Sequence, residues 1–375
     1  MTLEEQLAEL PPAMAERLRA RGFKAERLAE WAALVGVDRD GRNRLKGSVE
    51  PPRPGDLIDL PAPESDEAKA YYARGLEALR RGEVALCVLA GGMATRMGGM
   101  VKALAEAIPG HTFLDLRLAE NAHLAKLAGR PVPLWMMTSE ATEGPIRKAL
   151  GDRHHEEHLT TFEQHVSLRL TAERGVFLDE HGEPSVYSTG HGDLPDALRD
   201  SGLLKRFLDG GGRVVCIANI DNLGATVDPT IVGLHLAHGA PVTVELVDKV
   251  GSDRGGGPVR HEGRPIITEE FRLPLGFDAS KVPVFNTNTF LVDARALADL
   301  SMAWTYVEVE KKIGEAKAVQ FERLLGEITA ALEPRFLRVP REGVRSRFLP
   351  VKDLAELEKR RPEIELVARA RGMLG

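Results

Sequence analysis

The feature that most constrains the fold is a regular alternation of short apolar runs with longer stretches of helical spacing, between about residues 84 and 292. The apolar runs are VALCVLA, PVPLWMMT, VSLRL, RVVCIANI, APVTVELV and VFNTNTFLV. Stretches such as FLDLRLAENAHLAKLAG and DALRDSGLLKRFLDG lie between them and have the spacing of amphipathic helices. This pattern predicts an α/β fold in which helices cover a mostly parallel sheet.

The segments outside this region have simpler patterns. Residues 1–35 show helical apolar spacing, and residues 65–83 predict a second amphipathic helix with Ser65 as its N-cap and Gly82 near its end. The polar, proline-rich stretch 38–56 is interpreted as an extended connection. Residues 307–332 and 352–372 are both expected to be helical.

Composition excludes some classes of protein. The chain is 43% hydrophobic and 28% charged, which is typical of a globular protein with a large core. A formal net charge of −6 argues against a general binder of nucleic acids or membrane surfaces. The acidic start MTLEEQLAEL lacks a signal pattern, so we expect a cytoplasmic protein. Cys87 and Cys216 each lie in an apolar run and are interpreted as buried strand residues without a disulfide.

A glycine-rich loop, LAGGMATRMGGMVKA, follows the first apolar run at residues 89–103. Its glycines do not have the spacing of a P-loop or of a dinucleotide fingerprint. They do allow the backbone to approach a ligand closely, while Arg96 and Lys102 supply positive charge that suits a polyphosphate. The alternative is a structural turn. In parallel sheets, ligands bind beyond the carboxyl ends of the strands, which is where this loop is predicted to lie.

Several segments taken in order resemble one family. The glycine loop is similar to the signature loop of UTP-dependent sugar-1-phosphate uridylyltransferases, in particular the eukaryotic-type UDP-glucose pyrophosphorylases, with Ala94 in place of a glycine and Val101 in place of a proline. Further segments resemble the family's motifs in the family's order, over roughly residues 80–352. They are PLWMMTSEAT, FEQH, TGHGDLPDALRDSGLL, NIDNLGATVD, FNTNTF and RSRFLPVKD.

The resemblance implies a Rossmann-like nucleotidyltransferase fold of the GT-A-like type. This is a mixed, mostly parallel sheet with helices on both faces, here with an N-terminal helical region. We expect a helical region and linker at residues 1–80 and the nucleotidyltransferase catalytic domain at 81–335. A short C-terminal segment at 336–375 would carry a phosphate-binding lysine. The oligomeric state is left open.

The resemblance also implies the reaction, in which UTP and glucose 1-phosphate give UDP-glucose and pyrophosphate. The sugar phosphate is ionised at neutral pH, so the reaction requires alignment of two anions and neutralisation of charge and does not require a general base. Lys102, Lys352 and Arg96 are the implied catalytic residues, and Asp221 is the implied ligand of Mg²⁺.

The remaining implied residues bind the two substrates. The nucleotide-binding set is Leu89, Gly91, Gly92, Gln164 and Gly192. The sugar- and phosphate-binding set is His191, Asn219, Lys249, Glu269, Asn286 and Asn288. Structural alternatives are a turn role for His191 and Asn219 and a solvated surface role for the lysines.

Three other functions are compatible with parts of the sequence. The same reaction on N-acetylglucosamine 1-phosphate or galactose 1-phosphate is the nearest one. A catalytically inactive nucleotide-sugar-binding protein is the second. The third is zinc hydrolysis at HHEEH, residues 154–158, because on a helix His154 and His158 would lie one turn apart, with His165 as a possible third ligand.

Overall fold

The computed structural model describes residues 1–94, 98–251, 253 and 255–374. The helices are α1 (Leu3–Ala8), α2 (Pro12–Ala20), α3 (Ala25–Leu34), α4 (Arg39–Asn43), α5 (Asp66–Arg81), α6 (Phe113–Ala128), α7 (Glu143–Leu150), α8 (Leu194–Asp200), α9 (Leu203–Asp209), α10 (Pro229–His238), α11 (Ala294–Ala298), α12 (Ile328–Ala331) and α13 (Leu354–Ala370).

The strands are β1 (Val49–Glu50), β2 (Leu57–Asp59), β3 (Val84–Leu89), β4 (Met93–Ala94), β5 (Met100–Val101), β6 (Glu106–Ile108), β7 (His111–Thr112), β8 (Leu134–Thr138), β9 (Leu159–Glu163), β10 (Val166–Leu168), β11 (Val186–Ser188), β12 (Val214–Asn219), β13 (Val242–Asp248), β14 (Gly257–His261), β15 (Arg264–Thr268), β16 (Val284–Asp293), β17 (Val307–Ile313), β18 (Ala316–Glu322) and β19 (Pro334–Arg338).

The central sheet contains, within the described residues, eight strands in the order β2-β19-β13-β16-β12-β3-β8-β9. Strand β16 runs antiparallel to both of its neighbours, and the remaining pairs are parallel. The prediction of a mixed, mostly parallel sheet is therefore confirmed.

Helices cover both faces of this sheet because the strand side chains alternate. In β3, Leu86 and Val88 enter one hydrophobic core with residues of α5, α6, α10 and α13. Cys87 and Leu89 enter a second core with residues of α8, α9 and α11. This alternation follows from the period of two along a strand, and it confirms that both faces are covered and that Cys87 is buried.

The helix ends follow local signals. The Ser65 hydroxyl accepts a hydrogen bond from the Ala68 N–H at 3.1 Å, and Gly82 ends α5 with a φ of 76°. Thr112 and Asp115 form a capping box at the start of α6. The predictions for residues 65–83 and 352–372 are thus confirmed, the latter by α13.

Two expectations outside the central region were wrong. Residues 307–322 form the hairpin β17-β18, because VEVEKKI alternates with a period of two and Gly314 supplies a φ of 58° at the turn. Residues 38–56 do not form only a connection. Asp38 caps α4. Val49 of β1 pairs with His261 of β14, so the conformation of β1 depends on a strand that is distant in sequence.

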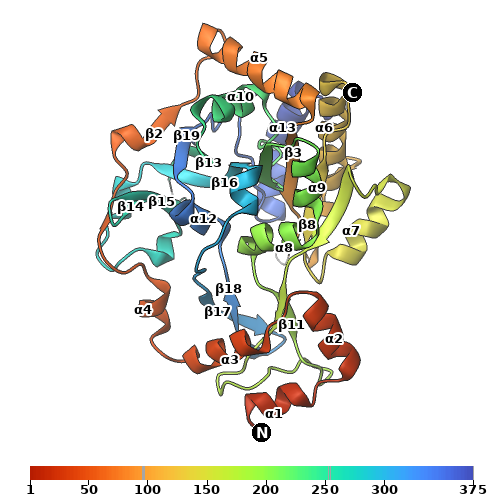
Figure 1. Cartoon of the computed structure of the whole chain (residues 1–375), viewed down its shortest axis with the longest axis vertical. Coiled ribbons are helices and arrows are strands. Elements are labelled where there is room, and N and C mark those ends of the chain that lie inside the picture. Colours follow the sequence, from red (N-terminus) through yellow and green to blue (C-terminus); the bar gives the residue numbers. More distant parts are fainter. Residues whose placement is uncertain (95–97, 252, 254, 375) are drawn as a thin grey trace.

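The N-terminal helices build a third hydrophobic core. Leu18, Leu28 and Trp31 pack with Leu168 of β10 and Phe321 of β18. In Figure 1, α1, α2 and α3 lie with β17 and β18 at one end of the molecule, and α5 and α10 lie at the opposite end.

Candidate active site

The candidate site lies at the carboxyl ends of β3 and β12. These strands are parallel neighbours, and the last residue of each, Leu89 and Asn219, are register partners. The glycine loop and segment 220–228 therefore leave the sheet side by side. This is the edge of a parallel sheet at which ligands bind.

The described parts of the glycine loop on either side of residues 95–97 pair with each other. Strand β4 pairs antiparallel with β5, and the Lys102 N–H donates to the Gly92 carbonyl at 3.2 Å. Ala94 and Val101, the two departures from the family pattern, are buried and pack in the first core. Their side chains thus help to anchor the β4–β5 pair. Arg96 lies outside the described residues.

Gly91 approaches a glutamine closely. A Cβ at this position would overlap the Nε2 atom of Gln164 and lie 3.3 Å from the Ser139 Cβ. The Gln164 N–H donates to the Thr138 carbonyl at 2.9 Å, which fixes the glutamine beside the end of β8. The structure therefore brings Leu89, Gly91 and Gln164 together, and glycine is required at residue 91 because of this contact.

A lysine and a carboxylate meet next to the loop. The Lys102 Nζ atom lies 2.8 Å from the Asp221 Oδ2 atom, and the Val351 N–H donates to the same oxygen at 3.3 Å. Lys352, which is exposed, directly follows Val351 in the chain. The Val351 contact therefore brings the backbone next to Lys352 to Asp221. Three segments that are distant in sequence thus converge on one nearly buried carboxylate.

A cluster of amides lies on the neighbouring strand. The β13–β16 register shifts between Glu245 and Leu246, which leaves a bulge that contains Asn288 with a φ of 57°. The Asn288 side-chain amide donates to the Asn219 Oδ1 atom at 2.9 Å, and the Asn288 N–H donates to the Asn286 Oδ1 atom at 3.0 Å. The bulge therefore directs Asn288 toward the end of β12.

Glu269 lies against the glycine segment 255–257. A Cβ on Gly256 would meet the Glu269 Oε1 atom at 2.8 Å, and the Asn286 N–H donates to the Gly256 carbonyl at 2.8 Å. Burial raises the pKa of the Glu269 carboxyl. The Lys249 Nζ atom lies 3.9 Å from Glu270. Glu269 thus reaches the amide cluster through Gly256 and Asn286.

His191 and Gly192 have structural partners. The His191 Nδ1 atom accepts a hydrogen bond from the Leu325 N–H at 2.9 Å, and burial lowers the pKa of this histidine, so the ring is neutral at pH 7. A Cβ on Gly192 would overlap the Arg323 backbone. No hydrogen bond or ion pair joins either residue to Lys102 or Asp221 in the described part of the chain. Their substrate contacts stay predictions.

Arg117 on α6 is a fully buried arginine that is not among the residues predicted from the sequence. Its guanidinium donates to the carbonyls of Asn219 and Ala225 at 3.0 Å and of Asn222 at 2.5 Å, and it pairs with Glu120 at 2.7 Å. These hydrogen bonds fix the backbone of the segment that carries Asp221. The available signal was an arginine among leucines in FLDLRLAE, with a glutamate three residues later.

The zinc alternative assumed a helix that is not formed. Residues 154–158 form a turn, in which His154 contacts the Thr160 hydroxyl at 3.0 Å and the rings of His155 and His158 stack at 4.9 Å. Across the ranges that the structure describes, no three His, Cys, Asp or Glu side chains are grouped to hold a metal ion. In the same ranges, every helix is too short or too polar to cross a membrane.

The fold and the site together define an α/β protein with a mostly parallel sheet, whose candidate ligand-binding edge lies at the ends of β3 and β12. The fold is shared with solved structures from Trypanosoma brucei. A UDP-glucose phosphorylase matches at 23% identity with a TM-score of 0.72, over 91% of this chain and 76% of that chain. A uridine diphosphate N-acetylglucosamine pyrophosphorylase matches at 21% identity with a TM-score of 0.70, over 95% and 83%.

Residues 48–361 match the family described as UTP–glucose-1-phosphate uridylyltransferase, and the chain belongs to this family. A uridylyltransferase of that name from Hordeum vulgare is 30% identical over 81% of this chain and 65% of its own length. One from Encephalitozoon cuniculi is 28% identical over 75% and 58%. The chain thus spans less than two thirds of these relatives.

Proposed function

We propose that this protein transfers the uridylyl group of UTP to glucose 1-phosphate. A phosphate oxygen of the sugar phosphate attacks the α-phosphorus of UTP, a new P–O bond forms, and the bond to the bridging oxygen breaks, which releases pyrophosphate. No proton has to be removed from this nucleophile. Family membership supports the proposal, and the observation that carries it is the convergence of Lys102, Asp221 and the Val351–Lys352 segment on one point.

The proposed role of each residue follows from its position in the site. Gly91 and Gln164 are proposed to hold the uridine end, since they touch each other beside Leu89. Lys102 is proposed to bind the UTP phosphates, and Lys352 the phosphate of the sugar. A lysine is suited to both tasks because it places a compact charge with three donors on a phosphate. Such pairing aligns two anions that otherwise repel each other.

The amide cluster is proposed to recognise the sugar. Asn219, Asn286 and Asn288 hold one another through side-chain hydrogen bonds and each retains further donor or acceptor capacity. Sugar hydroxyls both donate and accept, so a preorganised group of amides is a fitting partner. Glu269, Lys249 and His191 are proposed to complete the sugar side, and Gly192 is proposed to contact the nucleotide.

Asp221 is proposed to bind Mg²⁺. It offers one carboxylate with one oxygen already engaged by Lys102 and Val351, which fits a cation that takes its other ligands from phosphate oxygens and water. When bound, the ion would neutralise charge on the phosphates. Removal of divalent metal with a chelator is expected to abolish turnover, and added Mg²⁺ to restore it.

The test is pyrophosphate release from UTP and Mg²⁺ with glucose, N-acetylglucosamine and galactose 1-phosphates. Glucose 1-phosphate is expected to be preferred. Lys102→Ala is expected to lower kcat by about 10²- to 10³-fold, as for loss of one preorganised donor to a developing charge. Lys126→Ala, an exposed lysine on α6, is the matched control and keeps full activity.

Other outcomes would redirect the proposal. Preference for another sugar would keep the mechanism and change the substrate. Folded protein that binds UDP-glucose without turning over any of the three sugars would be an inactive nucleotide-sugar-binding protein. Full activity of Lys102→Ala would remove this lysine from the phosphate site.

A further inference from the structure

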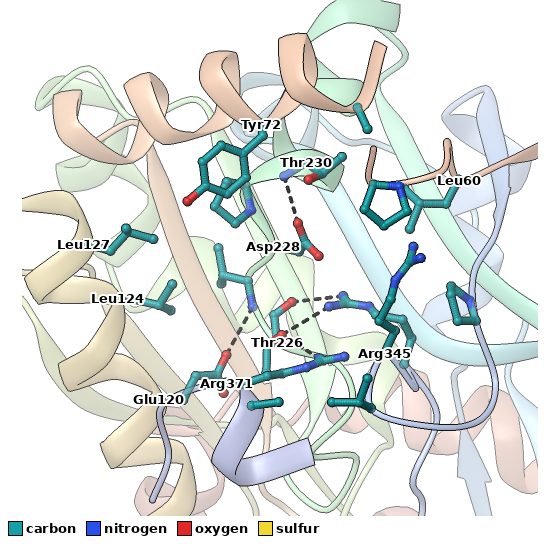
Figure 2. Close-up of a pocket in the computed structure, with 18 of the residues that line it drawn as sticks. Leu60, Tyr72, Glu120, Leu124, Leu127, Thr226, Asp228, Thr230, Arg345 and Arg371 are labelled. Carbon is teal, nitrogen blue, oxygen red and sulfur yellow. Dashed lines mark hydrogen bonds between the residues drawn. The ribbon is translucent and has the colours of Figure 1, made fainter. Parts of the chain in front are cut away.

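A pocket lies among α5, α6, α10 and the end of α13. It has a volume of about 400 Å³, within the usual range for small-molecule sites. Apolar side chains form much of its wall, with Leu124 and Leu127 of α6 on one side, Leu60 on the other and Tyr72 of α5 above (Figure 2). Thr226 and Arg371 lie at its floor.

The hydrogen-bond partners of Arg371 within the described residues are neutral groups. Its guanidinium donates to the Gly224 carbonyl, to the Thr226 hydroxyl at 2.7 Å and to the Ser346 carbonyl at 2.7 Å, all of which are neutral. No carboxylate of the described residues forms an ion pair with it. Burial and the nearby Arg347 lower its pKa to about 10, so it remains cationic at pH 7. Three bonds leave two of its five N–H groups for a ligand.

A second guanidinium at the same pocket, that of Arg345, is exposed and forms no hydrogen bond or ion pair with any described residue. The acids nearby are mostly engaged. Glu120 pairs with Arg117 and accepts the Val227 N–H, and Asp228 accepts the Thr230 N–H at the start of α10. Arg347 is neutralised by its own buried pair, Glu245.

These pairs leave one net positive charge at the pocket, since Asp228 offsets one of the two unpaired arginines, Arg345 and Arg371. A charge of this size matches a monoanion better than a phosphate monoester, which carries nearly two negative charges at pH 7. Two guanidiniums with free N–H groups suit the two oxygens of a carboxylate. The apolar walls add a preference for an apolar body.

We propose that this pocket binds a small monocarboxylate with an apolar body, whose carboxylate contacts Arg345 and Arg371 and whose body lies between α5 and α6. The pocket shares two segments with the candidate active site. Thr226 follows Asp221 by five residues in one segment, and Arg345 precedes Lys352 in the other. The Asn222 side chain ties the two together, through the Arg347 carbonyl at 3.1 Å and the Leu349 N–H at 2.8 Å.

Occupancy of the pocket is therefore expected to order both segments and to tighten UTP binding. This consequence rests on the proposed function, whereas the binding of a carboxylate does not. The coupling is reciprocal, so UTP would tighten carboxylate binding by the same factor.

Calorimetric titration of the whole chain with benzoate tests the site directly. We expect binding in the millimolar range, as for a ligand of this size. Benzamide, which is neutral and of the same shape, and phenyl phosphate should both bind at least about tenfold more weakly. Arg345→Gln should weaken benzoate binding by about tenfold. Leu127→Trp should abolish it by filling the pocket.

The matched control is Arg335→Gln, which removes an exposed arginine of β19 outside the pocket and should not change benzoate binding. Absence of benzoate binding at about 10 mM would overturn the site. Equal affinity for benzoate and benzamide, or an unchanged affinity in Arg345→Gln, would also overturn it.

The coupling is read from UTP titrations with and without saturating benzoate. We expect UTP to bind about fivefold more tightly when benzoate is present, and no change in Arg345→Gln. Unchanged UTP affinity with benzoate bound would overturn the coupling and keep the site. Normal pyrophosphate release without benzoate binding would overturn the site and keep the proposed function.

Discussion

At the residue scale, the side chain that best explains how the candidate site is held is Arg117. It is fully buried, and its guanidinium gathers three carbonyls of segment 219–225 while it pairs with Glu120. Glu120 in turn accepts the Val227 N–H at 3.1 Å. The Arg117–Glu120 ion pair therefore forms hydrogen bonds with backbone groups near both ends of the segment that carries Asp221.

Replacement of this arginine is predicted to destabilise the protein strongly. Arg117→Met leaves Glu120 buried and unpaired, so we expect the free energy of unfolding in urea to fall by about 3–5 kcal/mol. Arg81→Met, which breaks the exposed pair with Glu77, is the control and should cost less than about 1 kcal/mol. Adding Glu120→Gln to Arg117→Met should recover part of the loss. A loss as small as that of Arg81→Met would show that Arg117 does not hold the segment.

His235 on α10 gives a pH dependence of stability. Burial lowers the pKa of His235 from 6.5 to about 4, and its Nδ1 atom lies 2.9 Å from the Thr243 hydroxyl. Between these pH values the unfolded chain binds more protons than the folded one, so stability falls as the pH falls. The contribution is complete above about pH 6.5, and on the order of 3 kcal/mol should be lost by pH 4.

Urea unfolding at a series of pH values would measure this effect. His235→Gln should flatten the curve between pH 6.5 and pH 4, whereas His238→Gln, an exposed histidine three residues later, should leave it unchanged. An identical slope in wild type and His235→Gln would assign the loss to other groups.

At the element scale, α5 packs closely on α10. A Cβ on Gly75 would overlap the Pro229 carbonyl, and one on Gly233 would overlap the Tyr71 carbonyl. The two helices touch through their backbones because both contact positions are glycine. This contact places α10, and with it the end of segment 219–228, against the first core.

Gly75→Ala is therefore expected to destabilise the protein by about 1–3 kcal/mol or more, since the helices must separate. Gly144→Ala is the matched control. It lies in α7 with nothing within 4 Å of the added Cβ, and because Pro145 disfavours the helical conformation of a preceding alanine, the gain from replacing glycine is offset and the free energy of unfolding should stay within about 0.5 kcal/mol of wild type. Thermal unfolding of both variants would measure the difference, and a stabilised Gly75→Ala would contradict the close packing.

At the scale of the whole molecule, the third core attaches the N-terminal helices to two antiparallel strand pairs, β10–β11 and β17–β18. The Trp31 ring stacks on Phe321 at 5.3 Å and contacts Tyr306 at 4.5 Å. The Tyr187 hydroxyl donates to the Phe321 carbonyl at 3.0 Å, which ties β11 to β18. The helices α1–α3 thus complete a core that these two strand pairs alone would leave open (Figure 1).

Trp31→Ala is predicted to lower the free energy of unfolding by about 3–5 kcal/mol, because it leaves a cavity in this small core. Val37→Ala, a change at an exposed residue near the end of α3, should stay within about 0.5 kcal/mol of wild type. Urea unfolding followed by circular dichroism would compare the two. Equal stability of both variants would show that the N-terminal helices contribute little.

Local patterns by themselves determined a large part of this protein. The apolar runs predicted the strands β3, β8, β12 and β13, and caps such as Ser65 and Gly82 predicted where α5 begins and ends, because these signals act within one turn or one strand. The ordered motifs predicted the family. They also predicted that the glycine loop follows a central strand, where the structure places it.

Only the tertiary structure decided the rest, because it depends on partners that are distant in the chain. The direction of β16, the β17–β18 hairpin and the pairing of Val49 follow from neighbouring strands. The contact of Lys102 with Asp221 joins residues 119 positions apart. In the sequence, Arg117 has the spacing expected of a residue on the charged face of a helix. Only the fold shows that its partners are carbonyls, because every residue type has the same carbonyl and the sequence carries no mark of which ones an arginine will reach.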